Sequence, residues 1–118
     1  MSGKIYYDIV KERQARNLDD AVAFIRIEEL SPFPFAELRQ VLARYSLAKE
    51  FFWLQEEPRN QGAYSHVWHR INSVLVDMGR GESLVYKGRK ESSIPATGIG
   101  KSYATQQRTV INAPFEGL

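Results

Sequence analysis

Cysteine is absent from the 118 residues, and histidine and tryptophan occur only twice each. The lack of cysteine excludes a disulfide framework, thiolate catalysis and thiolate metal sites. No apolar run approaches the roughly 20 residues that span a bilayer, and residues 1–4 lack the apolar stretch of a signal peptide, so we expect no membrane partner. Neither sign of charge is in large excess. A balance of 16 basic and 14 acidic residues does not favour nucleic acid as a partner.

The hydrophobic content of 43% suits one compact domain over residues 1–118. Apolar residues three and four apart predict helices over residues 5–17, 35–45, 63–78 and 102–112. Short, nearly continuous apolar runs predict strands at 21–27, 50–55 and 83–86. This alternation predicts an α/β fold, a three-layer parallel sheet with helices on both faces.

The carboxyl ends of parallel strands share one edge, where ligands usually bind, and here the loops begin at Glu28, Glu56 and Lys87. Two glutamate pairs, at 28–29 and 56–57, could therefore face one crevice as an acid and a base or as a hard-cation site. The alternative is structural: adjacent carboxylates point in different directions, and one of them pairs with an arginine or caps a helix. No nucleophile accompanies them, which favours the structural interpretation.

Three further motifs have a functional and a structural interpretation. His66 and His69 could hold zinc, but no third ligand is suitably spaced, so we expect no metal site. Residues 98–102 end like a phosphate-binding loop, yet Pro95 stands where the loop requires its first glycine. Phe33 and Phe35, between and after two prolines, predict an aromatic contact within the core or with a neighbouring domain.

Three segments stand out together by their order and spacing. They are Ser2-Gly3-Lys4-Ile5-Tyr6-Tyr7-Asp8, Ile25-Arg26-Ile27-Glu28-Glu29-Leu30 with Pro32-Phe33-Pro34, and Gln55-Glu56-Glu57-Pro58 with Asn60-Gln61-Gly62. With Tyr86, Gly88-Arg89 and residues 95–98, they closely resemble the C-terminal domain of the decarboxylase component of 2-oxoglutarate dehydrogenases. The related 2-oxoadipate dehydrogenases are similar here as well.

The resemblance implies a fold like the C-terminal domain of transketolase. It implies a parent enzyme that uses thiamine diphosphate and magnesium to decarboxylate a 2-oxo acid and passes the acyl group to lipoyl-lysine. The expected partners are the remainder of the parent chain, a second copy of it in a homodimer, and the acyltransferase component. The family's cofactors bind in other domains, so we expect no catalytic residue and no cofactor in this chain. The compartment would be the mitochondrial matrix in a eukaryote or the cytoplasm in a bacterium.

Two further expectations come from the family. An apolar strand normally precedes the segment that begins at Ser2, so we expect the isolated domain to lack its first strand and to self-associate or to be marginally stable. Some relatives bind acetyl-coenzyme A or an adenine nucleotide, and Lys49, Arg89 and Lys101 are the candidate cations for its phosphates. Glu56 and Glu57 join Phe33 and Phe35 as candidate interface residues.

Overall fold

The structure is a computed structural model that describes residues 1–89 and 100–118, and from residue 105 onward it also places the side chains of the last segment. The chain contains four helices and two strands in these residues, followed by a short 3-10 turn, η1. In chain order they are α1 (Ile5–Ala15), α2 (Phe35–Ala43), β1 (Phe51–Pro58), α3 (Tyr64–Asp77), β2 (Leu84–Arg89), α4 (Gly100–Asn112) and η1 (Ala113–Phe115). The four predicted helices are confirmed, with ends that differ by one or two residues.

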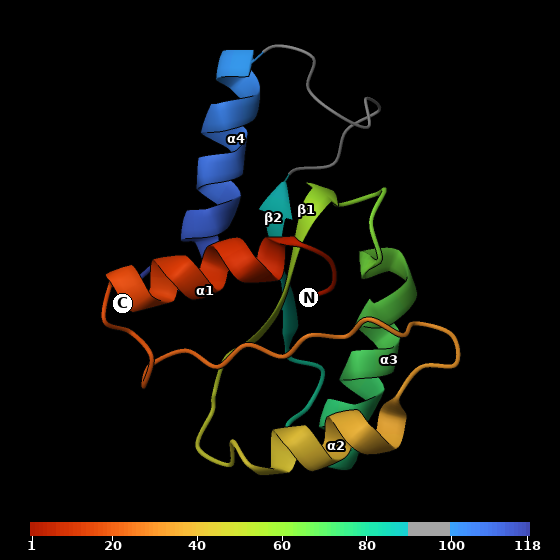
Figure 1. Cartoon of the computed structure of the whole chain (residues 1–118). Helices are drawn as coiled ribbons and strands as arrows, with labels where there is room; N and C mark the ends of the chain where they lie inside the picture. Colours follow the sequence, from red (N-terminus) through yellow and green to blue (C-terminus); the bar gives the residue numbers. More distant parts are fainter. Residues whose placement is uncertain (90–99) are drawn as a thin grey trace.

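The two strands run parallel and lie side by side at the centre of Figure 1, joined by a connection that contains α3. Phe51 pairs with Leu84, and the register continues to Gln55 opposite Gly88 before an irregularity at Pro58. Parallel strands require such a long connection, because a tight turn can join only antiparallel ones. The α/β class and the parallel pairing are therefore confirmed.

The prediction of a third strand at residues 21–27 was wrong: this segment has no regular structure. Its only ladder-like backbone partner among the described residues is Met1, and a strand forms only when a neighbour pairs with it along its length. The described sheet is therefore two-stranded. Both observed strands are longer than expected, so Glu56, Glu57 and Lys87 lie within strands and do not begin loops.

Two hydrophobic clusters lie against β1, and neighbouring side chains of the strand belong to different clusters. Trp53 packs with residues of α2 and α3, whereas Leu54 packs with α1 and the end of α4. Side chains alternate between the two faces of a strand, so these clusters occupy opposite faces. Figure 1 shows α2 and α3 packed together, away from α1 and α4.

The segment 21–30 follows the same division although it forms no strand. Ile25 and Ile27 pack in the cluster of Trp53, and Phe24 packs in the cluster of Leu54. This alternation has the two-residue period of a strand. The hydrophobic pattern therefore determines the direction of these side chains even where the backbone hydrogen bonds are missing.

Candidate functional site

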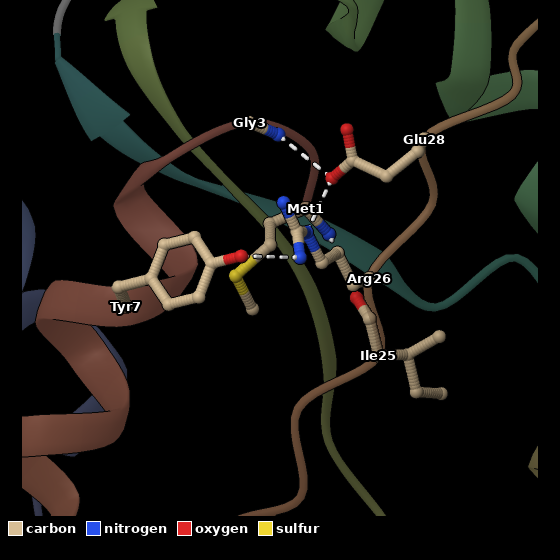
Figure 2. Close-up of polar contacts among 6 residues, drawn as sticks. All are labelled: Met1, Gly3, Tyr7, Ile25, Arg26 and Glu28. Carbon is tan, nitrogen blue, oxygen red and sulfur yellow. Dashed lines mark hydrogen bonds and ion pairs between the residues drawn. The ribbon is translucent and has the colours of Figure 1, made fainter.

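The start of the chain pairs with the segment before Glu28. The amino group of Met1 donates to the Ile25 carbonyl at 3.2 Å, and Figure 2 draws both residues. The Ile27 N–H donates to the Met1 carbonyl at 2.7 Å. Both bonds belong to Met1, and their partners, Ile25 and Ile27, lie two residues apart. This is the hydrogen-bond pattern of two parallel strands. Burial lowers the pKa of the Met1 amino group from 8.0 to about 5, and the Glu28 carboxylate partly opposes this shift.

Glu28 is held in place by hydrogen bonds from two neighbouring residues. Its Oε1 accepts hydrogen bonds from Arg26 Nε at 2.6 Å and from the Gly3 N–H at 3.0 Å (Figure 2). The bond from Arg26, followed by that from Gly3, lowers the pKa of the Glu28 carboxyl group. Arg26 also donates to the Tyr7 hydroxyl at 3.1 Å. The structural interpretation of this glutamate, as the partner of an arginine, is confirmed.

Glu56 also has a structural partner. Its Oε1 accepts from Gln107 Nε2 at 3.0 Å, and Gln107 Oε1 accepts from the Arg89 guanidinium at 2.7 Å. These three residues belong to β1, α4 and β2, so the chain of hydrogen bonds joins α4 to both strands. The Glu57 side chain is exposed, and its main-chain carbonyl accepts from Gln55 Nε2 at 3.2 Å. The four glutamates therefore do not form the shared acidic crevice that one interpretation of the sequence suggested.

The side chain of Gln55 organises the loop after β1, a role that the sequence analysis missed. It is 3% exposed, and its Oε1 accepts from Trp53 Nε1 at 2.9 Å and from the Tyr64 N–H at 3.0 Å. Its Nε2 donates to the carbonyls of Glu57 and Pro58. All the hydrogen-bonding groups of this buried amide have partners, as burial requires. A glutamine directly after the apolar run at residues 51–54 was the available signal.

An aromatic and cationic cluster closes the same end of the sheet. The Tyr64 and Tyr86 rings meet edge to face at 4.9 Å, and the Arg59 guanidinium lies 5.3 Å and 5.6 Å from their respective centroids. Burial raises the pKa of the Tyr86 hydroxyl to about 12, so this group stays protonated at neutral pH. A neutral phenol that donates to main-chain carbonyls is a packing group and not a proton acceptor.

Both histidines make contacts within the protein that give them structural roles. His66 Nε2 lies 2.8 Å from the Leu30 carbonyl oxygen, which ties α3 to the segment before α2. His69 packs edge to face with Trp68, at 5.7 Å between the ring centroids, and contacts Arg70. In the part of the chain whose side chains are placed, no three histidine, aspartate or glutamate side chains come together as a possible metal site.

The three cations proposed for a regulatory ligand are not brought together. Lys49 is exposed just before β1, whereas Arg89 ends β2 at the opposite end of the parallel pair and bonds to Gln107. Lys101 lies in α4, where the structure does not describe its side chain. A regulatory site for acetyl-coenzyme A or an adenine nucleotide is therefore not supported. The phosphate-loop motif at 98–102 begins outside the described residues.

Phe33 and Phe35 form an edge-to-face pair with centroids 4.8 Å apart at the start of α2. Phe33 belongs to the main hydrophobic cluster, whereas Phe35 is 46% exposed. The predicted core role is confirmed for Phe33, and the exposed Phe35 ring remains available for an interface. Within the described residues, no helix has the length and apolar character needed to cross a bilayer.

Comparison with known proteins gives one consistent family. A family model described as "2-oxoglutarate dehydrogenase C-terminal" matches residues 1–115. The chain is 42% identical over 115 residues to a probable 2-oxoadipate dehydrogenase complex component E1 homolog of Caenorhabditis elegans, covering 98% of the chain and 12% of that protein.

Two bacterial relatives are equally similar. The 2-oxoglutarate dehydrogenase E1 component of Cupriavidus necator is 41% identical over 117 residues, and that of Azotobacter vinelandii is 40% identical over 114 residues. These matches cover 99% and 97% of the chain but only 12% of each relative. The chain belongs to the family of C-terminal domains of 2-oxoglutarate and 2-oxoadipate dehydrogenase E1 components.

Proposed function

We propose that residues 1–118 form the structural domain that completes a homodimeric 2-oxo acid dehydrogenase and contribute no catalytic group themselves. The observation that carries this proposal is the match over residues 1–115 to a family named for its C-terminal position, in relatives of which the chain spans 12%. The proposed enzyme oxidatively decarboxylates 2-oxoglutarate or 2-oxoadipate and transfers the acyl group to lipoyl-lysine of an acyltransferase partner. Thiamine diphosphate, with magnesium, would supply the decarboxylation chemistry in the remainder of the chain.

The side chains described above support a structural task. Glu28 and Glu56, two of the four candidate carboxylates, accept hydrogen bonds from Arg26 and Gln107, and the buried amide of Gln55 is fully bonded within the domain. We propose a transketolase-like arrangement of three layers for the complete domain, because the two hydrophobic clusters lie on opposite faces of β1. The enzyme would act in the mitochondrial matrix of a eukaryote or the cytoplasm of a bacterium.

Phe35 and Glu57 are the proposed contacts with the remainder of the enzyme. The first is a large apolar side chain that is 46% exposed beside buried Phe33, and the second is an exposed carboxylate at the end of β1. Exposed aromatic side chains are enriched at interfaces, and a peripheral charge contributes to the choice of partner. Glu56 and Phe33 would hold these two contact residues in position.

Removal and return of the domain test this function. The enzyme without residues 1–118 is expected to lose decarboxylation of both 2-oxoglutarate and 2-oxoadipate, measured as carbon dioxide release. Residues 1–118 added as a separate chain are expected to bind the truncated enzyme in calorimetry and to restore activity. A truncated enzyme with full activity, or a folded domain without affinity for it, would contradict the proposal.

A point variant tests the proposed interface even if the truncated enzyme does not fold. Phe35→Ser in the full-length enzyme is expected to weaken the dimer at least about tenfold in sedimentation equilibrium. Val76→Ser, which changes a 49% exposed side chain on α3, is the matched control and is expected to leave the dimer unchanged. Equal dimer affinity in both variants would remove Phe35 from the proposed interface.

A further inference from the structure

A groove of about 370 Å³ runs along the outer edge of β2. Three consecutive residues of the strand, 86–88, line it. Arg59 lines it from the face of the sheet that carries α3, whereas Thr109 and Ala113 line it from α4 and η1 on the opposite face. Among the described residues, none from β1 lines the groove, so it lies on the side of β2 that faces away from β1.

The backbone of β2 presents hydrogen-bonding groups to this groove. In a parallel pair, the N–H and C=O groups of successive residues alternate between the two edges of a strand. The Leu84 N–H bonds to the Asn72 side chain at 2.9 Å instead of to β1, so the N–H groups of Tyr86 and Gly88 also point away from β1. In the described part of the chain β2 pairs only with β1, and no other backbone group bonds to residues 85–88. The outer edge of β2 is therefore an open template for a further strand.

Lys87 does not shield this edge, although lysines often protect the open edges of sheets. Its Nζ donates to the Ala113 carbonyl at 3.2 Å and lies 4.5 Å from the centroid of the Phe52 ring. Both contacts hold the side chain against the face of the sheet, under η1. Val85 lies on the same face, two residues earlier, and is 58% exposed. The edge is therefore accessible to a second chain.

The charge of the groove indicates which kind of segment fits it. Arg59 and Lys87 line it together with a single acidic residue, Glu116. The Arg59 guanidinium is held by the rings of Tyr64 and Tyr86, and it makes no ion pair with the described residues. An arginine held in this way loses little further freedom when it binds a carboxylate. A second copy of this edge would bring the same excess of positive charge, so charge complementarity favours an acidic partner.

The position of the groove favours a separate protein over the remainder of the enzyme chain. Met1 begins the region that matches the family, and it packs with Leu54 of β1 and bonds to Ile25 and Ile27. The start of the matched region therefore lies on the β1 side of the sheet. The groove lies on the β2 side, away from the point where the preceding part of a longer chain would join.

We propose that the outer edge of β2 binds an extended, acidic segment of a partner protein, which adds to the sheet as a strand and places a carboxylate against Arg59. Main-chain hydrogen bonds would give this complex its affinity, and the ion pair would give it selectivity. The inference goes beyond the proposed function, because it adds a partner surface that the decarboxylase reaction does not require. Decarboxylation is therefore not its readout.

Hydrogen exchange in the full-length enzyme tests this binding. The probe is a peptide with blocked ends and the six-residue length of β2, made of alternating valine and glutamate and supplied at millimolar concentration. We expect the exchange of the Tyr86 and Gly88 amides to slow at least about tenfold, because both would gain a strand partner. The amides of Val85 and Lys87 face β1 and serve as internal controls, so their rates should change much less. A matched peptide of valine and lysine is expected to give no protection.

A charge reversal tests the role of Arg59. Arg59→Glu is expected to weaken binding of the labelled glutamate peptide at least about fivefold in fluorescence anisotropy, because the ion pair is replaced by repulsion. The matched control is Arg39→Glu, which reverses an exposed arginine on α2 and should leave the affinity unchanged.

The other outcomes overturn the proposal, each for a different reason. Unchanged exchange at Tyr86 and Gly88 with the glutamate peptide would show that the edge accepts no strand. Equal protection by the lysine peptide, or equal affinity in the Arg59→Glu and Arg39→Glu variants, would remove the selection for an acidic partner. Protection without peptide that rises with enzyme concentration would place a second copy on the edge, and protection at every concentration would place another part of the enzyme there.

Discussion

The carboxamide of Gln55 occupies the space that a side chain at Gly62 would need. A Cβ atom at residue 62 would lie 2.6 Å from Cδ, Oε1 and Nε2 of Gln55. The amide cannot withdraw without losing its bonds to Trp53, Tyr64 and Pro58. Gln55 and Gly62 therefore depend on each other. Because residue 62 has no side chain, the loop can fold back onto the strand and lie against the Gln55 amide.

Gly62→Ala is therefore expected to lower the free energy of unfolding by about 2 kcal/mol, the usual range for an overpacked interior. Urea denaturation measures the change. A double variant, Gly62→Ala with Gln55→Ala, relieves the collision, so its loss should be smaller than the sum of the two single losses. Additive losses would show that the two side chains do not compete for space.

Asn72 connects α3 to the first residue of β2. This side chain is 6% exposed, and its Oδ1 accepts from the Leu84 N–H at 2.9 Å. Asn72→Ala leaves that N–H without its partner and is expected to cost about 1–3 kcal/mol in urea denaturation. Ser73→Ala changes an exposed neighbour on the same helix and should stay within about 0.5 kcal/mol. Similar losses in the two variants would contradict this role.

Gln107 connects α4 to both strands through Glu56 and Arg89. Gln107→Ala is expected to increase local opening of α4, with its amides exchanging about three- to tenfold faster, because two side-chain hydrogen bonds are lost. The matched control is Gln106→Ala, which alters an exposed glutamine one residue away. If Gln106→Ala accelerates exchange as much as Gln107→Ala does, the loss of the bridge is not the cause.

The stability of residues 1–118 should depend on pH through the Met1 amino group. Its pKa is about 5 in the folded chain and 8.0 as the ordinary value, so the unfolded chain binds more protons between these limits. The free energy of unfolding should therefore rise from pH 5 to pH 8, by about 4 kcal/mol for a shift of this size. Denaturation at several pH values, on protein whose intact Met1 is verified by mass, measures the slope.

N-acetylation is the control for this pH dependence. The acetylated amide nitrogen does not titrate, but it can still donate to the Ile25 carbonyl. The slope between pH 5 and pH 8 is expected to disappear. A slope that survives acetylation must come from another group, and the amino terminus would then not be buried as described.

Much of the local structure follows from patterns within short stretches. The spacing of Val67, Ile71 and Val74 predicts α3, and all three are buried in the fold. Gly79, with a φ of +76°, follows the helix end, where Arg80 N–H bonds to the Leu75 carbonyl. The pairing of Glu28 with an arginine was also foreseeable, because Arg26 lies two residues away on the same side.

The sequence by itself determined the helices, the parallel order of β1 and β2, and the family, because hydrophobic periodicity and motif spacing are local properties of the chain. Only the tertiary structure decided which groups meet across long separations. It joined Glu56 to Gln107 and left Lys49 and Arg89 at opposite ends of the strands. It also left residues 21–27 without a ladder, because a strand depends on a partner that its own residues do not specify.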